Sequence, residues 1–150
     1  MIHRKGKPGI RVRDWVVGPT IKKYVPTVFK IACDNSNIYA AGNFKTAGTI
    51  TVNGIAKWDG TSWSALGTGM NGIVYDIFVN TYDHTVYVVG DFTTAGGTVV
   101  NHIAKWDGTS WSAIGSGTNG TVFNIDQYFN IGGGFTTADG TLTNNIAQWQ

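Results

Sequence analysis

Trp58-Asp-Gly-Thr-Ser-Trp63 is repeated letter for letter as Trp106-Asp-Gly-Thr-Ser-Trp111, 48 residues later in the chain. Asp-Gly between aromatic and β-favouring residues predicts a hairpin with a two-residue type I′ turn, in which both central residues take a positive φ. Thr, Ser and Trp on either side of the turn suit strand surfaces. An identical hairpin at this spacing indicates that the chain is an array of repeated units.

The composition is that of a turn-rich β protein. The 150 residues include 21 Gly and 6 Trp, and only 13% are charged. All nine acidic residues are Asp, which favours turns, and Glu, which favours helices, is absent. The one cysteine excludes an intrachain disulfide. No apolar run reaches membrane-spanning length, and the charged start lacks the apolar segment of a secretory signal, so we expect neither feature.

Basic residues are concentrated at the N-terminus, whereas the repeats are nearly neutral. Residues 1–10 contain Gly6, Pro8 and Gly9 and predict a flexible arm. Such an arm is either a solubilising tail or a segment that docks on a partner or an anionic surface. Its short, unpatterned basic run argues against sequence-specific nucleic-acid binding. The candidate interaction residues are Arg4, Lys5, Lys7, Arg11 and Arg13.

Alternating and apolar segments predict two complete four-stranded units and one incomplete unit. The first unit has predicted strands at 28–33, 38–44, 54–58 and 62–66. The second unit has them at 73–79, 85–92, 101–106 and 110–114. The third unit has only three, at 121–125, 129–135 and 145–149, before the chain ends at Gln150.

An extra strand at the N-terminus matches the strand that the third unit lacks. Residues 11–17 alternate polar and apolar side chains, and Trp15 precedes Trp63 by the same 48 residues that separate Trp63 from Trp111. We therefore predict that residues 11–17 supply the fourth strand of the third unit, within one chain or exchanged between chains. Closing the sheets in this way removes exposed strand edges.

Four short antiparallel strands in a period of about 43–48 residues predict a β-propeller blade. Apolar residues on both faces of the strands fit blades that pack face to face. Gly42, Gly90 and Gly133 recur in the second strands and predict close backbone approach near a central axis. We therefore expect residues 11–150 to form an all-β unit of three four-stranded antiparallel blades.

Three blades are too few for a normal ring, because propellers have at least four. We predict that two chains form a homodimer with one six-bladed ring. The weaker variant is an open three-blade wedge that docks on other structural proteins of a larger assembly.

Two motifs carry a family resemblance. Ala-Gly-Asn-Phe-Lys-Thr-Ala-Gly at 41–48 and Gly-Ile-Ala-Lys-Trp-Asp-Gly-Thr-Ser-Trp-Ser-Ala-Leu-Gly at 54–67 resemble kelch-like β-propeller repeats. The first two units have Ala-Gly or Val-Gly where kelch repeats have Gly-Gly, and only Gly132-Gly133 is a true pair. The resemblance implies a propeller scaffold, found in secreted bacterial proteins and in proteins of large viruses and phages, and no common active site.

No constellation predicts catalysis, a metal ion or a cofactor. His3, His84 and His102 are scattered, and Cys33 lies in a first strand, as core or channel lining, without a patterned base to activate it. The Tyr, His and Tyr–Cys set of kelch-fold galactose oxidase cannot be placed on this chain. The segment Asn119-Gly-Thr121 fits a glycosylation acceptor, but Asn-Gly between strands is first of all a turn.

The repeated Trp residues are the one candidate binding constellation. Trp15, Trp63 and Trp111 recur on fourth strands, and Trp58, Trp106 and Trp149 recur on third strands. The first interpretation is that these rings pack blade on blade. The alternative is that the fourth-strand Trp residues stack on sugar rings, assisted by loop Asn and Asp residues.

We therefore expect a non-enzymatic structural or interaction propeller, held in a virion or other extracellular particle by its basic arm. The alternative function is a carbohydrate-binding propeller lectin, and a third is an enzyme subunit whose site forms only in the assembled ring. The expected partners are a second copy, other structural proteins or glycans. The alternative locations are the cytoplasm or the outside of the cell after non-classical secretion.

Overall fold

The computed structural model describes residues 25–150, which form an all-β fold of antiparallel sheets. The first sheet has the order β1-β2-β5-β6 and forms a simple meander. Its strands are β1 (Thr27–Cys33), β2 (Ile38–Asn43), β5 (Ile55–Trp58) and β6 (Trp63–Ala65). The predicted all-β antiparallel fold is confirmed, and the predicted strands of this unit are all present.

The second sheet repeats the same order with strands of the same lengths. Its strands are β7 (Ile73–Val79), β8 (Val86–Asp91), β11 (Ile103–Trp106) and β12 (Trp111–Ala113). Both faces of β8 are buried, since Val86, Val88 and Val89 have no exposed surface. Each face of this middle sheet is therefore covered by a neighbour.

The third sheet has three strands within the described residues, in the order β13-β14-β17. They are β13 (Val122–Ile125), β14 (Asn130–Gly133) and β17 (Ile146–Gln148). In residues 25–150, no strand pairs with the outer edge of β17. The predicted arm at 1–10 and the predicted strand at 11–17 lie outside the described residues.

A two-stranded ribbon interrupts the long loop of every unit, where the sequence predicted only loop. In each ribbon, the Ala that ends the first strand is buried, whereas the Thr before it is exposed or half-buried. The ribbons are β3 (Thr46–Ala47) with β4 (Ile50–Thr51), β9 (Thr94–Ala95) with β10 (Thr98–Val99), and β15 (Thr137–Ala138) with β16 (Thr141–Leu142). Two residues per strand are too few to carry a periodic signal.

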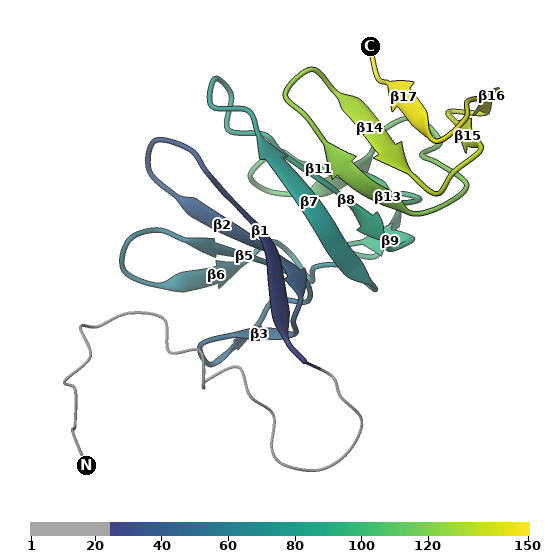
Figure 1. Ribbon diagram of the computed structural model, residues 1–150. Coiled ribbons are helices and arrows are strands. Elements are labelled where there is room, and N and C mark those ends of the chain that lie inside the picture. The colour runs from purple at the N-terminus through teal and green to yellow at the C-terminus, as the bar shows by residue number, and fades with distance from the viewer. Residues whose placement is uncertain (1–24) are drawn as a thin grey trace, which may run out of the picture.

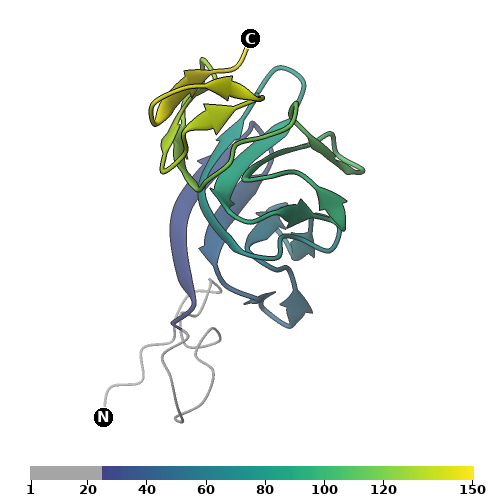
Figure 2. The same cartoon turned by 90° about the vertical axis from the view of Figure 1, so that its right-hand side faces the viewer.

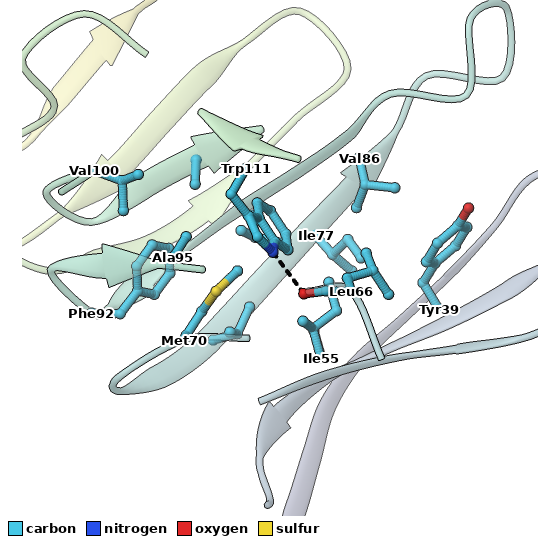
Figure 3. Packing of buried hydrophobic residues seen from close by; sticks show 14 of the residues in the cluster. Tyr39, Ile55, Leu66, Met70, Ile77, Val86, Phe92, Ala95, Val100 and Trp111 are labelled. Atoms are coloured by element: carbon cyan, nitrogen blue, oxygen red, sulfur yellow. Dashed lines mark hydrogen bonds between the residues drawn. The ribbon is translucent and has the colours of Figure 1, made fainter. Parts of the chain in front are cut away.

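The three sheets lie one after another, with their first strands as neighbours: β1 contacts β7, and β7 contacts β13 (Figure 1). The C-terminus lies beside β17 at the end of this row (Figures 1 and 2). Apolar clusters fill both junctions between sheets. Figure 3 shows the first junction, where Leu66 and Ile55 from the first unit meet Ile77, Val86 and Trp111 from the second.

Each repeated Trp-Asp-Gly-Thr-Ser-Trp segment forms a four-residue loop, so the prediction of a two-residue type I′ turn is wrong. Trp58 pairs directly with Trp63, and their rings lie 5.3 Å apart. Asp59 Oδ1 accepts the backbone N–H groups of Thr61 and Ser62, both at 2.8 Å. Only Gly60 in this loop has a positive φ. The Asp side chain thus closes the loop in place of a second left-handed residue.

The glycines of the second strands are required by the neighbouring first strand. A Cβ at Gly42, Gly90 or Gly133 would clash with the carbonyl oxygen of Thr27, Ile73 or Thr121, respectively. Each first strand has a β-bulge just after this point. The close backbone approach predicted from the sequence is confirmed, and the bulged first strand is what makes it close.

Candidate functional site

A cleft of about 380 Å³ opens between the first and second sheets, at the end where the β1–β2 and β7–β8 turns lie. Polar and aromatic side chains from both units line it. They include Asp34, Asn37, Tyr39, Lys57, His84 and Trp106. The cleft therefore combines carboxylate, amide, ammonium, imidazole and indole groups on one rigid frame.

The second junction has a cluster of aromatic side chains at the place that corresponds to this cleft. At the second junction, the rings of Phe78, Tyr87 and Phe129 pack together, with centroids 4.8 to 6.0 Å apart. Phe78 pairs with Tyr87 across β7 and β8, and in the first sheet Ala32 pairs with Tyr39 at the same register. Since Ala32 lacks a ring, the first junction keeps a space that aromatic side chains fill at the second.

Asp34 holds the two sides of the cleft together. Its side chain is fully buried and accepts hydrogen bonds from the backbone N–H groups of Ser36 and Asn37 at 2.8 and 2.7 Å. Tyr39 Oη donates to Asp34 Oδ2 at 3.4 Å, and His84 Nδ1 from the second unit lies 3.3 Å from the same oxygen. The side chain of His84 is itself more than half exposed. The sequence placed His84 in a turn beside Asp83, but did not connect it with Asp34, 50 residues away.

These contacts shift two pKa values in opposite directions. Burial alone raises the pKa of Asp34, but the hydrogen bonds from Ser36, Asn37 and His84 outweigh it and lower the pKa to about 2. Burial and the adjacent Asp34 carboxylate raise the pKa of Tyr39 to about 12. Asp34 is thus ionised and Tyr39 is neutral throughout the neutral range. Neither group exchanges a proton near pH 7, as a general acid or base would.

We expect Asp34→Asn to remove part of the acid sensitivity of the fold. The folded-state pKa of Asp34 lies below its ordinary value of 3.8, so the ionised side chain stabilises the fold above about pH 4. This contribution is lost as the pH falls towards 2. Thermal melts should therefore show a Tm difference between the natural protein and the variant at pH 6 that shrinks steadily between pH 4 and pH 2. A difference that is independent of pH would contradict this role of Asp34.

The other carboxylate at the cleft, Asp107, is already used by its own loop. Its Oδ1 accepts the backbone N–H groups of Thr109 and Ser110, both at 2.8 Å, and these bonds lower its pKa to about 2. Residues 25–150 contain no group of three His, Cys or Asp side chains placed to share a metal ion. Both carboxylates of the cleft are therefore ionised at neutral pH and held by hydrogen bonds within their own turns.

The repeated Trp residues occupy different environments despite identical local sequence. Trp111 is only 6% exposed, and its Nε1–H donates to the carbonyl of Leu66 at 2.7 Å (Figure 3). Trp63 is half-buried against the first sheet's own cluster. Trp106 is the Trp that lines the cleft, although the sequence analysis proposed only the fourth-strand rings for stacking. The position of Trp106 at the end of the repeated Ile-Ala-Lys-Trp strand is the sequence feature that could have indicated its place at the cleft.

Several other predicted residues have structural positions. Cys33 is exposed at the end of β1 and does not lie in the core of this chain. His102 Nδ1 lies 3.2 Å from the carbonyl of Gly90. The Asn119 side chain accepts the N–H groups of Thr136 and Thr137 at 2.8 and 2.9 Å, so it fastens the loop before β13 to the ribbon of the third unit. Trp15 and the basic candidates Arg4, Lys5, Lys7, Arg11 and Arg13 lie outside the described residues.

Comparison with protein-family models, curated proteins and solved structures finds no match for this chain. The kelch-like resemblance therefore stays a prediction from the repeated motifs. Within residues 25–150, no helix is long and apolar enough to cross a membrane. The function must accordingly be argued from the repeats, the cleft and the junctions between sheets.

Proposed function

We propose that this chain is a non-enzymatic structural and interaction module built as three blades of a β-propeller. The observation that carries the proposal is the row of like antiparallel sheets, whose first strands are neighbours and whose faces pack through apolar clusters. Blades of a propeller are joined in this manner, with the first strand of each blade nearest the axis. The cleft carboxylates, with pKa values near 2, favour recognition over proton transfer.

The open edge of β17 supports the proposal that residues 11–17 provide the fourth strand of the third blade. Trp58 pairs with Trp63, and Trp106 pairs with Trp111, across the third and fourth strands. The same register would set Trp15 opposite Trp149 and Val16 opposite Gln148. Because only residues 18–26 separate this segment from β1, we assign the strand to the blade that precedes the first one in the ring. That blade is the third blade of another copy.

We expect Val16→Cys and Gln148→Cys, in a Cys33→Ser background, to form a disulfide between chains under mild oxidation. Residues directly opposite on paired strands have Cβ atoms close enough to be bridged. A non-reducing gel should show a covalent dimer. Val16→Cys with Tyr82→Cys is the control, because Tyr82 lies in the remote β7–β8 turn and is almost fully exposed. A cross-link within one chain, or none, would contradict the exchanged strand.

We further propose that the basic arm tethers this module in a virion or other extracellular particle. The charge distribution supports this, since eight of the eleven Lys and Arg residues lie in the first thirty. The test is to delete residues 1–10 and measure incorporation into the native particle, with the thermal melt as the control for folding. Unchanged incorporation of a folded, truncated chain would overturn the tether.

A carbohydrate-binding function is the second candidate, and the Trp106 cleft favours it. An indole ring beside Lys57, Asn37 and Asp34 could stack on a sugar ring while polar groups contact its hydroxyls. A glycan array separates the two functions. Binding that is lost in Trp106→Ala, with the melt unchanged, would establish the lectin, whereas no binding at high protein concentration supports the structural module.

A further inference from the structure

We infer that a second copy of this chain covers two open sheet faces and that each copy seats its first sheet on the third sheet of the other. The inference rests on the proposed propeller and names its partner and contact residues. The front face is the side of the first sheet that carries Ile31 and Ile38. The rear face is the side of the third sheet that carries Ile146. Both faces repeat residues that are buried at the two internal junctions.

The front face is defined by an isoleucine that recurs in every first strand. Ile31, Ile77 and Ile125 hold the same register position, opposite Ala40, Val88 and Ile131 of the second strands. Ile77 is 3% exposed and Ile125 is 8% exposed, because each packs against the preceding sheet. Ile31 is 63% exposed. Among the residues that the structure describes, the front face thus lacks the preceding sheet that covers the same position in the second and third sheets.

Two neighbours of Ile31 follow the same pattern. Val86 begins β8 and is fully buried, whereas Ile38, which begins β2 at the same register, is exposed. Val79 ends β7 and is buried, whereas Cys33, which ends β1, is exposed. Ile31, Ile38 and Cys33 of the front face are therefore exposed at register positions where the second sheet has buried apolar residues.

The rear face shows the opposite half of the junction. Ile55, Ile103 and Ile146 begin the third strands of the three sheets at the same register. Ile55 and Ile103 are 0% and 1% exposed because the following sheet covers them, but Ile146 is 67% exposed. A following sheet would remove this side chain from water, as it does twice within the chain.

An aromatic row along the first strands points to the same occupant. Phe29, Tyr75 and Phe123 lie in the three β-bulges. The ring centroids of Phe29 and Tyr75 are 5.5 Å apart, and those of Tyr75 and Phe123 are 5.2 Å apart. Tyr75, in the middle, has a ring on each side and is half-buried, whereas Phe29 and Phe123 are exposed. Seating a second copy places its Phe29 next to Phe123 and continues the row around the axis.

A hydrogen bond between the first strands of the second and third sheets has an equivalent acceptor on the third sheet that lacks a donor among the described residues. Asp76 Oδ2 accepts the backbone N–H of Ile125 from the following sheet at 3.0 Å, and Lys30 Nζ lies 3.6 Å from Asp76 Oδ1. Asn124 holds the position of Asp76 in the third sheet, and its side chain has no hydrogen-bond partner among residues 25–150. The same geometry would let Asn124 Oδ1 accept the backbone N–H of Ile31 from the second copy.

A second copy fits these faces because each repeats an isoleucine of the internal junctions. On the rear face, Ile146 repeats Ile55 and Ile103 of the covering sheets, and on the front face, Ile31 repeats Ile77 and Ile125 of the covered sheets. Elsewhere on the rear face, Asp126 and Asn130 stand where the second sheet has Phe78 and Tyr87, so this contact is more polar than the internal ones. One chain supplies three blades, and two chains supply six, within the range of closed propellers. A twofold axis then makes both contacts identical and leaves neither face open.

Native mass spectrometry of the full chain tests the inference. We expect twice the chain mass of 16.1 kDa for the natural protein. Ile146→Asp should weaken self-association at least about 30-fold, because a charge would be buried at the centre of each contact. Val99→Asp is the matched control: Val99 lies in the β9–β10 ribbon of the second unit and is exposed, away from the front and rear faces, so this variant should stay dimeric. A monomeric natural protein, or a ladder of masses above two copies, overturns the inference.

The single cysteine provides a second readout. Cys33 lies on the front face, so it should react slowly with iodoacetamide in the natural dimer and at the rate of a free thiol in Ile146→Asp. Equal rapid reaction in both would overturn the proposed seating. These experiments distinguish the dimer from the proposed tether. A stable monomer whose incorporation into particles requires residues 1–10 would support the tethered module and contradict the second copy. A dimer whose incorporation ignores residues 1–10 does the reverse.

Discussion

Trp111→Ala should lower the free energy of unfolding by about 3–5 kcal/mol, the range for removing a large buried aromatic side chain. Trp111 packs in the same apolar cluster as Leu66, Met70 and Val100 at the first junction, and its Nε1–H donates a hydrogen bond to the Leu66 carbonyl. The substitution therefore empties a volume between two sheets and leaves a buried carbonyl without its donor. Urea denaturation with a fluorescence readout from the remaining Trp residues would measure the loss.

Two further variants divide this effect into its parts. Trp111→Phe keeps most of the ring packing but removes the N–H, so we expect a loss of about 1–3 kcal/mol. Trp63→Ala removes the residue with identical local sequence from a half-buried position, and we expect it to cost less than half as much as Trp111→Ala. Equal losses for Trp63→Ala and Trp111→Ala would contradict the different roles of the two rings.

Gly133→Ala should be the most damaging single-methyl change in the third sheet. The added Cβ would clash with the Thr121 carbonyl oxygen and would lie 2.8 Å from Val122 Cα, and both are backbone atoms where β13 begins. Backbone cannot rotate away as a side chain does, so β13 must move from β14 or the bulge must open. We expect a loss of about 3 kcal/mol or more, at the upper end of what overpacking costs, measured as a lower urea midpoint.

The adjacent glycine is the control for this variant. A Cβ at Gly134 would have only ordinary contacts, at 3.9 Å from the Phe123 ring and 4.0 Å from the Thr121 carbonyl. The first two units carry Asn43 and Asp91 at this position, so a side chain is accepted there. Gly134→Ala should therefore be neutral or stabilising by about 0.4–1 kcal/mol through the unfolded chain. A similar loss in both variants would show that the close approach at Gly133 is not the cause.

The sheets could be predicted from the sequence because their signals are local and repeated. Strand boundaries at 73–79 match β7 (Ile73–Val79) residue for residue, and the others differ by one or two positions. The constant 14-residue spacing from Phe44 to Trp58 and from Phe92 to Trp106 fixed the length of the long loop. The turn type was predicted wrongly because Asp-Gly suits two loops, and the Asp59 side chain accepts two N–H groups only in the longer one.

The candidate site could be predicted only in part, because it is formed by residues from different units. The sequence gives no sign that Asp34 and His84 are in contact, because 50 residues separate them and neither belongs to a repeated motif. At the first junction, Ala32 and Val86 stand where the second junction has Phe78 and Phe129, and these differences have no meaning until two sheets face each other. The aromatic row of Phe29, Tyr75 and Phe123 likewise required the first strands to be adjacent.

The sequence by itself determined the repeat, the order of the strands and the glycines that let them approach, because each depends on residues close together in the chain. The tertiary structure decided which copies of a repeated residue are buried. Trp111 is buried and Trp63 is half-buried although they share the same six-residue motif, and Ile146 is exposed although it shares its strand position with the buried Ile55 and Ile103. The reason is physical: burial depends on what covers a side chain, and within residues 25–150 a neighbouring sheet covers Ile55 and Ile103 but not Ile146.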